Sequence, residues 1–268
     1  MCIIAIAWQL FDEMPLVILS NRDEFLERPT TAVHQWQDAP IFAGRDDRSG
    51  GTWLGIHQYK DQNSRLEQNG RWAAVLNFRD GVQASEDERS RGELVAGFLT
   101  SDLSPMAFAR QINLQDYAGF NLIVGDTQQA VMVNNRGYAP TPLYAGLHVL
   151  SNGQPDDSWF KTERLRGRLR QEVLPLISED SSLEYWQAAA WEVLSDDQQA
   201  PDNQLPDTGI APEIEQSLSS ICISNAALPN YGTRTQSILT LRTQQPSQNS
   251  DLAKPIASLI SREFKPSI

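Results

Sequence analysis

The second residue of the chain, Cys2, is the first candidate for chemistry, because it is one of two cysteines among 268 residues. If Met1 is removed, Cys2 carries both a thiol nucleophile and a free α-amino group. An α-amino group has an ordinary pKa of about 7.7–8.0, so it can accept a proton near neutral pH. This pair is typical of hydrolases that use an N-terminal nucleophile with its own amine as base. The alternative is a small residue that happens to begin a buried strand.

Two short apolar segments must position Cys2. Residues 2–9 and 16–20 are predicted strands, and residues 11–15 supply the turn between them. In an antiparallel hairpin of this length, residue 2 faces about residue 23. Facing Cα atoms are roughly 4.5–5.5 Å apart. The polar residues expected beside Cys2 are therefore Asn21, Arg22 and Asp23.

These polar side chains suit a cysteine nucleophile. The carboxylate of Asp23 can hold the terminal ammonium or orient the thiol, and the guanidinium of Arg22 favours thiolate over thiol. The alternative is that the segment NRDE closes a strand as a charged, solvated loop. Because the predicted hairpin places this segment opposite Cys2, a functional site is favoured over a solvated loop.

The composition predicts a globular protein of the reducing, cytoplasmic compartment. Apolar residues make up 40 % of the chain and charged residues 21 %, which is typical of a folded domain. The net charge of −12 disfavours nucleic acid as the main partner. Two cysteines do not form a disulfide-rich scaffold. We expect neither a signal peptide nor a transmembrane helix, since no basic segment precedes the first apolar run and no apolar run reaches about 18 residues.

Several motifs with known chemistry are absent from the sequence. The G-x-S-x-G elbow and the glycine-rich nucleotide loops are missing. His34, His57 and His148 are far apart and lack metal-type spacing, so we expect no metal site and no required cofactor. Cys222 alternates like a buried strand residue and is expected to be inert.

The order of elements predicts an α+β fold, with strands first, helices in the middle and strands again at the end. We expect one domain over residues 1–268, with a mobile loop rich in Asp, Gln and Pro at residues 195–216. The tail around Pro246 gives no clear prediction. Further predicted strands are 52–57, 72–78, 119–125, 130–134, 147–150, 219–224 and 237–241, and predicted helices are 89–99, 104–112, 158–177 and 183–194.

Eight short motifs, in one order along nearly the whole chain, resemble those of the NRDE family. They are MCI at the start, SNRDE at 20–24, GGTW at 50–53, LNFR at 76–79, SRGELV at 90–95, GFNL at 119–122, LSN at 150–152 and YGTR at 231–234. The resemblance implies a four-layer αββα sandwich of the N-terminal-nucleophile hydrolase type. It does not imply one reaction. Links to haem trafficking and lipid handling have been proposed for members of the family.

A more distant resemblance, to choloylglycine hydrolases and penicillin V acylases, implies site residues. Those enzymes begin with Met-Cys and carry an Asn-x-Asp motif, which Asn21 and Asp23 match. In their oxyanion hole one donor is a backbone N–H, to which Asn77 of Leu76-Asn77-Phe78 corresponds. The other donor is an asparagine side chain, to which Asn152 corresponds. The alternative is that Asn77 and Asn152 cap a strand end or a turn.

Two arginines and one tryptophan are the remaining candidates. The late arginine of those enzymes has its nearest counterpart in Arg234. Their first arginine precedes the Asn-x-Asp motif, whereas here Ser20 holds that position and Arg22 lies inside the motif. Trp53 is either a packed turn residue or part of a substrate pocket for an apolar group.

The sequence therefore predicts a cysteine hydrolase that cleaves a non-peptide amide or related acyl bond after removal of Met1. Its expected ligand is a small acyl amide. The alternative is a non-catalytic protein that binds or carries haem or an acyl lipid on the same scaffold. The oligomeric state is not predicted.

Overall fold

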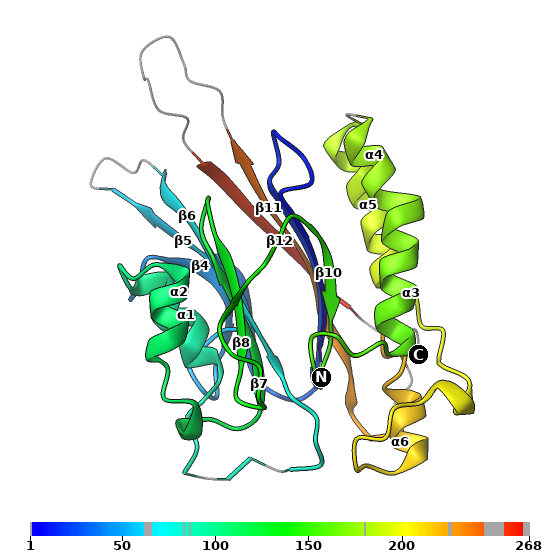
Figure 1. Ribbon diagram of the computed structural model, residues 1–268. Coiled ribbons are helices and arrows are strands. Elements are labelled where there is room, and N and C mark those ends of the chain that lie inside the picture. Colours follow the sequence, from blue (N-terminus) through cyan, green and yellow to red (C-terminus); the bar gives the residue numbers. More distant parts are fainter. Residues whose placement is uncertain are drawn as a thin grey trace.

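Two antiparallel sheets lie face to face at the centre of the structure, and helices cover both outer faces (Figure 1). This computed structural model describes residues 2–61, 66–82, 84–85, 87–179, 181–224, 227–243 and 255–264. The order of layers is helices, sheet, sheet, helices. The predicted four-layer αββα sandwich is therefore confirmed.

The first sheet has five strands and contains the predicted hairpin. Cys2 lies opposite Arg22 rather than Asp23, so the predicted register was wrong by one residue. The reason is the turn, which pairs Trp8 rather than Gln9 with Leu16. In spatial order the strands are β10 (Gly146–Leu150), β1 (Cys2–Trp8), β2 (Leu16–Phe25), β11 (Tyr231–Thr243) and β12 (Pro255–Glu263).

The second sheet has seven strands, in the order in which they occur in the chain. Strands β3 and β4 were not predicted, because their short sequences TTAVHQ and IFAGRD mix polar and apolar residues without clear alternation. In spatial order the strands are β3 (Thr30–Gln35), β4 (Ile41–Asp46), β5 (Leu54–Lys60), β6 (Leu66–Asn77), β7 (Phe120–Gly125), β8 (Ala130–Asn134) and β9 (Thr141–Pro142).

The helices form two separate outer layers, which Figure 1 shows on opposite sides of the paired sheets. The predicted helix over 158–177 is one continuous helical segment with a wider π-helical turn at its centre. Over the second sheet lie α1 (Gly92–Thr100) and α2 (Pro105–Gln111), and over the first lie α3 (Phe160–Arg168), the π turn (Leu169–Val173), α4 (Leu174–Ser178) and α5 (Leu183–Leu194).

Strand β1 is apolar along its whole length because both of its faces are buried. Ile3, Ala5 and Ala7 pack in the cluster beneath α3 and α5. The alternate residues Ile4, Ile6 and Trp8 pack between the sheets. The inter-sheet cluster takes residues from both sheets.

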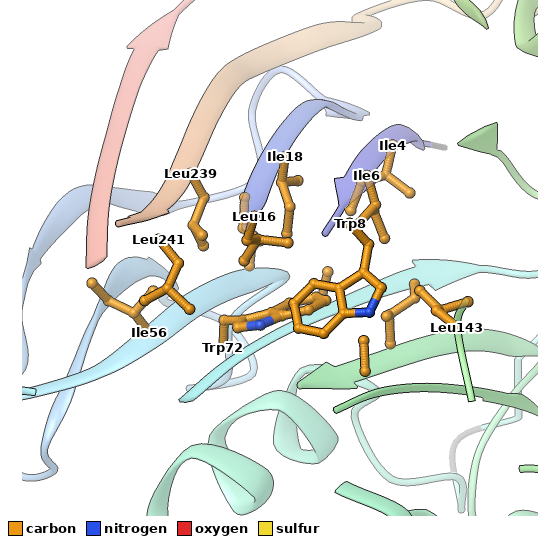
Figure 2. Packing of buried hydrophobic residues seen from close by; sticks show 14 of the residues in the cluster. Ile4, Ile6, Trp8, Leu16, Ile18, Ile56, Trp72, Leu143, Leu239 and Leu241 are labelled. Carbon is orange, nitrogen blue, oxygen red and sulfur yellow. The ribbon is translucent and has the colours of Figure 1, made fainter. Parts of the chain in front are cut away.

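Two tryptophans from different sheets meet in the inter-sheet cluster. The ring centroids of Trp8 and Trp72 are 6.1 Å apart, and Figure 2 shows Leu16, Ile18 and Leu241 directed into the same space. Burying a large apolar side chain contributes about 1.5–3 kcal/mol, so this end of the sandwich is a major source of stability.

The predicted strand over 219–224 was wrong. Its backbone N–H groups do not pair with a neighbouring strand. The N–H of Cys222 donates to the carbonyl of Asp196, and the N–H of Ile223 donates to the side chain of Thr233. These contacts hold the segment as a buried turn. Strand β12 was not predicted, and Pro246 lies outside the described residues.

The segment 195–216 contains helical structure that the sequence did not predict. A 3₁₀ turn covers Asp202–Gln204 and the short helix α6 covers Pro212–Ser217, while a further 3₁₀ turn lies elsewhere at Leu114–Asp116. The N–H of Ala200 bonds to the hydroxyl of Ser219, 2.8 Å away. The mobility of this segment stays a prediction.

Candidate active site

The NRDE motif lies inside strand β2, which continues beyond Ser20 to Phe25. The exposed fractions of Asn21, Arg22 and Asp23 are 0 %, 5 % and 3 %. The alternative of a solvated loop was therefore wrong. Cross-strand partners project to the same face of a sheet, so Cys2 and Arg22 both face the space between the sheets.

Arg22 is a buried cation with defined partners beside Cys2. Its guanidinium lies 3.0 Å from a carboxylate oxygen of Asp46 and 3.6 Å from one of Glu24. Its Cζ atom lies 4.4 Å from the ring centroid of Trp53. Burial lowers the pKa of Arg22, and the charges of Glu24, Cys2 and Asp46 oppose this shift. The carboxylates thus keep a positive charge next to the thiol.

Asp23 is held by a hydrogen bond from strand β11. The hydroxyl of Thr233 donates to a carboxylate oxygen of Asp23 at 2.6 Å, and the same hydroxyl accepts from the N–H of Ile223 at 2.8 Å. Burial raises the pKa of Asp23, whereas the charge of Lys161 and the bond from Thr233 act to lower it. Thr233 therefore holds the carboxylate of Asp23, and Ile223 in turn holds Thr233.

The side chain of Asn152 joins three of the predicted site residues. Its Oδ1 atom accepts from the backbone N–H of Cys2 at 3.3 Å, and its Nδ2 atom donates to the backbone carbonyl of Asn77 at 2.8 Å. The hydroxyl of Ser151 donates to the carbonyl of Cys2 at 2.8 Å. The ends of β1, β6 and β10 thus converge on one amide group.

A cavity of about 580 Å³ opens beside Cys2. Its walls include the predicted residues Arg22, Asp23, Trp53 and Asn77. They also include side chains that the sequence analysis did not single out: Glu24, Arg28, Asp46, Arg48, Glu88, Arg89 and Arg91.

The thiol of Cys2 is almost fully buried, with 9 % of the residue exposed. Burial raises the pKa of Cys2, while the positive charge of Arg22 acts in the opposite direction. The thiol therefore needs a base to remove its proton near neutral pH.

Three predicted residues do not line this cavity: Asn152, whose amide lies between Cys2 and Asn77, and also Asn21 and Arg234. Alternation along β2 turns Asn21 toward the helical layer, where its amide donates to the carbonyls of Leu194 and Ile221 at 2.8 Å each. Arg234 falls at a β-bulge of β11, which removes it from the ladder. Its guanidinium instead bonds to the carbonyl of Arg28.

Arg91 is a cavity residue that sequence reasoning missed. It precedes α1 and donates to the carbonyl of Gly119 at 3.2 Å. A direct backbone contact fixes its position, since a Cβ atom on Gly51 would lie 2.6 Å from the carbonyl carbon of Gly92. The motif SRGELV contained the signal, but it was interpreted as the start of a helix.

Lys161 was also missed. It is 1 % exposed, and its ammonium group donates to the carbonyl of Leu218 at 3.0 Å. Burial lowers the pKa of Lys161 to about 8; Arg79 acts in the same direction, whereas Asp23 and Cys2 oppose the shift. Its spacing was a usable signal, because positions 161, 165 and 169 share one helical face and the last two are buried leucines.

Three further observations concern the described residues. Burial raises the pKa of Cys222 to about 12, which suits an inert thiol. Within the described ranges, no group of three or more His, Cys, Asp or Glu side chains could hold a metal ion. In the same ranges, no helix has the length and hydropathy needed to cross a membrane.

Comparison with known proteins gives a family match over most of the chain. The family model described as Transport and Golgi organisation 2 matches residues 1–250. A Bos taurus Transport and Golgi organization protein 2 homolog is 31 % identical over 242 residues, which cover 84 % of this chain and 81 % of that protein. The Drosophila melanogaster Transport and Golgi organization protein 2 is 26 % identical over 247 residues, with 85 % and 82 % covered.

Among solved structures, a Caenorhabditis elegans N-acylethanolamine-hydrolyzing acid amidase ortholog is similar at a TM-score of 0.45 and 14 % identity. The match covers 72 % of this chain and 86 % of that one. Similarity at this level says nothing about the reaction. The resemblance to the NRDE family, whose best-known member is transport and Golgi organization protein 2, is confirmed by the sequence matches. The chain belongs to the Transport and Golgi organisation 2 family.

Proposed function

We propose that the protein is a cysteine hydrolase of the N-terminal-nucleophile type, which cleaves a non-peptide amide or a related acyl bond. One observation carries the proposal: the Cys2 thiol lines a cavity while Asn152 ties the Cys2 backbone nitrogen to Asn77. The reaction requires no cofactor. The cytoplasm, where two free thiols persist, is the compartment we assign to it.

The reaction begins with a change at the Cys2 nitrogen. Met1 lies outside the described residues, and its removal converts the Cys2 nitrogen from a peptide N–H into an amine. A peptide nitrogen is not a base, whereas the amine accepts the proton of the neighbouring thiol. Asp23 and the Oδ1 atom of Asn152 are the acceptors that we assign to the resulting ammonium.

Acyl transfer then proceeds in two steps. The Cys2 sulfur attacks the substrate carbonyl carbon, a C–S bond forms, the C–N bond breaks, and the departing amine takes the proton from the ammonium. Water next attacks the thioester and passes a proton to the α-amine. The C–S bond breaks, the carboxylic acid leaves and the thiol regains its proton.

Charge develops on the carbonyl oxygen during both attacks. We assign its stabilisation to the side-chain amide of Asn152 and the backbone N–H of Asn77, since one such donor contributes about 2.7–4 kcal/mol. Arg22 supplies a fixed positive charge beside the sulfur and offsets part of the cost of burying a thiolate.

The test combines intact mass with turnover of a panel of acyl amides. We expect the mature protein to lack Met1, Cys2→Ala to lose at least about a thousandfold in kcat/KM, and Cys222→Ser to retain activity. Retention of Met1, or equal turnover by Cys2→Ala and the parent chain, contradicts the proposal. Saturable binding of haem or an acyl lipid without any turnover would support a carrier instead.

A further inference from the structure

A second cavity, of about 390 Å³, adjoins the cavity of Cys2. Cys2 lines the first cavity, Asn152 lines the second, and Asn77 lines both. Arg91 also lines both. The group of residues proposed for catalysis therefore stands at the junction of two chambers rather than at the floor of one.

The second cavity has a largely apolar wall. None of the large apolar side chains along it belongs to the three core clusters of the described residues. They are Phe78, Val82, Ile210, Ile214, Leu218 and Leu228. Phe78, Ile210, Ile214 and Leu228 are half-buried, whereas Val82 is exposed and Leu218 is buried. Half-buried apolar groups that line a cavity indicate a surface for an apolar ligand group.

Helix α6 forms part of this wall and is fixed to the site. A carboxylate oxygen of Glu215 lies 2.9 Å from the guanidinium of Arg79, and both side chains are buried. The N–H of Arg79 also donates to the carbonyl of Asn152 at 2.6 Å. The apolar wall thus has a set position relative to Asn152.

The first cavity differs, because its wall is charged. Five arginines stand there among four carboxylates: Arg22, Arg28, Arg48, Arg89 and Arg91, with Asp23, Glu24, Asp46 and Glu88. Arg22 and Arg28 share the carboxylate of Asp46, and Arg89 pairs with Glu93. Arg91 donates to a carbonyl, and among the described residues no carboxylate lies within 4.0 Å of it. A largely buried guanidinium without an ion-pair partner is an attractive site for an anionic ligand group.

On the basis of the proposed function, we infer that the substrate is a single-chain acyl amide whose amine portion carries a carboxylate. The acyl chain occupies the apolar second cavity, the carboxylate binds Arg91, and the amide lies at the junction of Cys2, Asn77 and Asn152. Hydrolysis by the steps given above then releases a fatty acid and an amino acid.

Binding is tested with the full-length Cys2→Ala chain, so that turnover is not needed. The probes are N-acylglycines of increasing chain length and N-decanoylethanolamine, a neutral analogue of N-decanoylglycine. We expect affinity to rise about fourfold for each added CH₂ until the cavity is filled. The glycine conjugate should bind at least about tenfold more tightly than its neutral analogue.

Two variants test which cavity is responsible for the carboxylate preference and which for the chain-length preference. Arg91→Gln should remove the preference for the carboxylate, whereas Arg110→Gln, on the exposed surface of α2, should retain it. Ile214→Trp should shift the optimal acyl-chain length to shorter chains. Ile256→Trp, which changes an exposed side chain of β12, should not. Both control positions lie outside the two cavities.

The outcomes separate this inference from the proposed function. Equal affinity for charged and neutral probes, an effect shared by Arg91→Gln and Arg110→Gln, or no dependence on chain length overturns the inference. The same holds if no probe binds. If the parent chain shows the expected binding pattern but does not hydrolyse N-decanoylglycine, the ligand assignment holds and the hydrolase proposal fails.

Discussion

The two ends of the β1–β2 hairpin differ in what fills the space between the sheets. At one end Trp8 and Leu16 pack against Trp72 in an apolar cluster (Figure 2). At the other end the same faces of the same strands carry Cys2 and Arg22 beside a cavity. Along the whole hairpin, every second side chain faces the space between the sheets. Only the type of these side chains changes, from apolar at one end to polar at the other. One end therefore serves stability, and the other gives up packing for a polar site.

The largest expected effect on stability is at the apolar end. Trp72→Ala should lower the free energy of unfolding by about 3–5 kcal/mol, because it leaves a cavity opposite Trp8. Cys2→Ala, at the polar end, should cost only about 1 kcal/mol, since it removes one sulfur next to existing space. Urea unfolding of both variants measures the difference. Similar losses would show that the two ends contribute alike.

At the polar end the largest expected effect is on catalysis. Asn152→Ala should reduce kcat about 10²–10³-fold, because it removes the proposed oxyanion donor and the acceptor for the Cys2 nitrogen. Asn203→Ala, on the exposed turn Asp202–Gln204, is the matched control and should leave kcat unchanged. Steady-state kinetics on any amide that the parent chain cleaves gives the answer. An unchanged kcat for Asn152→Ala would remove that residue from the mechanism.

The ion pairs of the polar end should contribute less than the tryptophans. Asp46→Asn leaves Arg22 and Arg28 without a shared carboxylate and should lower the free energy of unfolding by about 2–3 kcal/mol. This loss is smaller than that expected for a fully buried ion pair, because Arg28 is partly exposed. The exposed pair of Asp38 and Arg45 provides the control, Asp38→Asn, which should unfold like the parent chain. Equal stability of both variants would contradict a structural role for Asp46.

The carboxylate of Asp46 should also make the stability of the parent chain sensitive to acid. Burial acts to raise the pKa of Asp46, but the hydrogen bond and charge of Arg28 outweigh it and hold the pKa below its ordinary value. The stabilisation is complete above the unfolded pKa of about 3.9 and is lost as the pH falls through the folded value. Between neutral pH and about pH 3, urea unfolding should show a smaller loss of stability in Asp46→Asn than in the parent chain. An equal loss in both proteins would assign the acid sensitivity to other groups.

The smallest expected effect concerns Lys161. Its folded pKa of about 8 lies below the ordinary 10.5, so the unfolded chain binds more protons between these values and stability rises with pH there. Between pH 8 and pH 9 this group should add about 1 kcal/mol to the free energy of unfolding. Lys161→Met should lack that increase, as urea unfolding at the two pH values will measure. An identical pH slope in both proteins would assign the titration to another group.

The sequence predicted elements with a strong pattern and missed those without one. Strand β1 is apolar throughout, and Leu165 and Leu169 follow helical spacing, so both elements were predicted. Strand β2 was predicted too short, because Asn21 and Asp23 are unusual residues for the interior of a sheet. The partners that make them acceptable there, Ile221 and Thr233, lie some 200 residues away in the chain.

The candidate site was predictable where it lies on one hairpin or in a matched motif. Cys2 and Arg22 face each other as expected from the hairpin, within one residue of register. Asn77 and Asn152 came from resemblance, and the structure joins them through one side chain. Arg234 was misplaced because a bulge changes which residues share a face, and a bulge leaves no mark in periodicity.

The contact between Gly51 and Gly92 has a consequence for how the proposed ligand preference of this chain can be altered by substitution. The backbones of Gly51 and Gly92 are in direct contact, so no side chain sets the distance between these two segments. Any larger residue at either position would push the start of α1, and Arg91 with it, away from the sheet. Under the proposed function, substitutions that change the ligand are therefore better made in the side chains that line the cavity near this contact, such as Arg91 and Trp53, because the contact itself leaves no room for a larger residue.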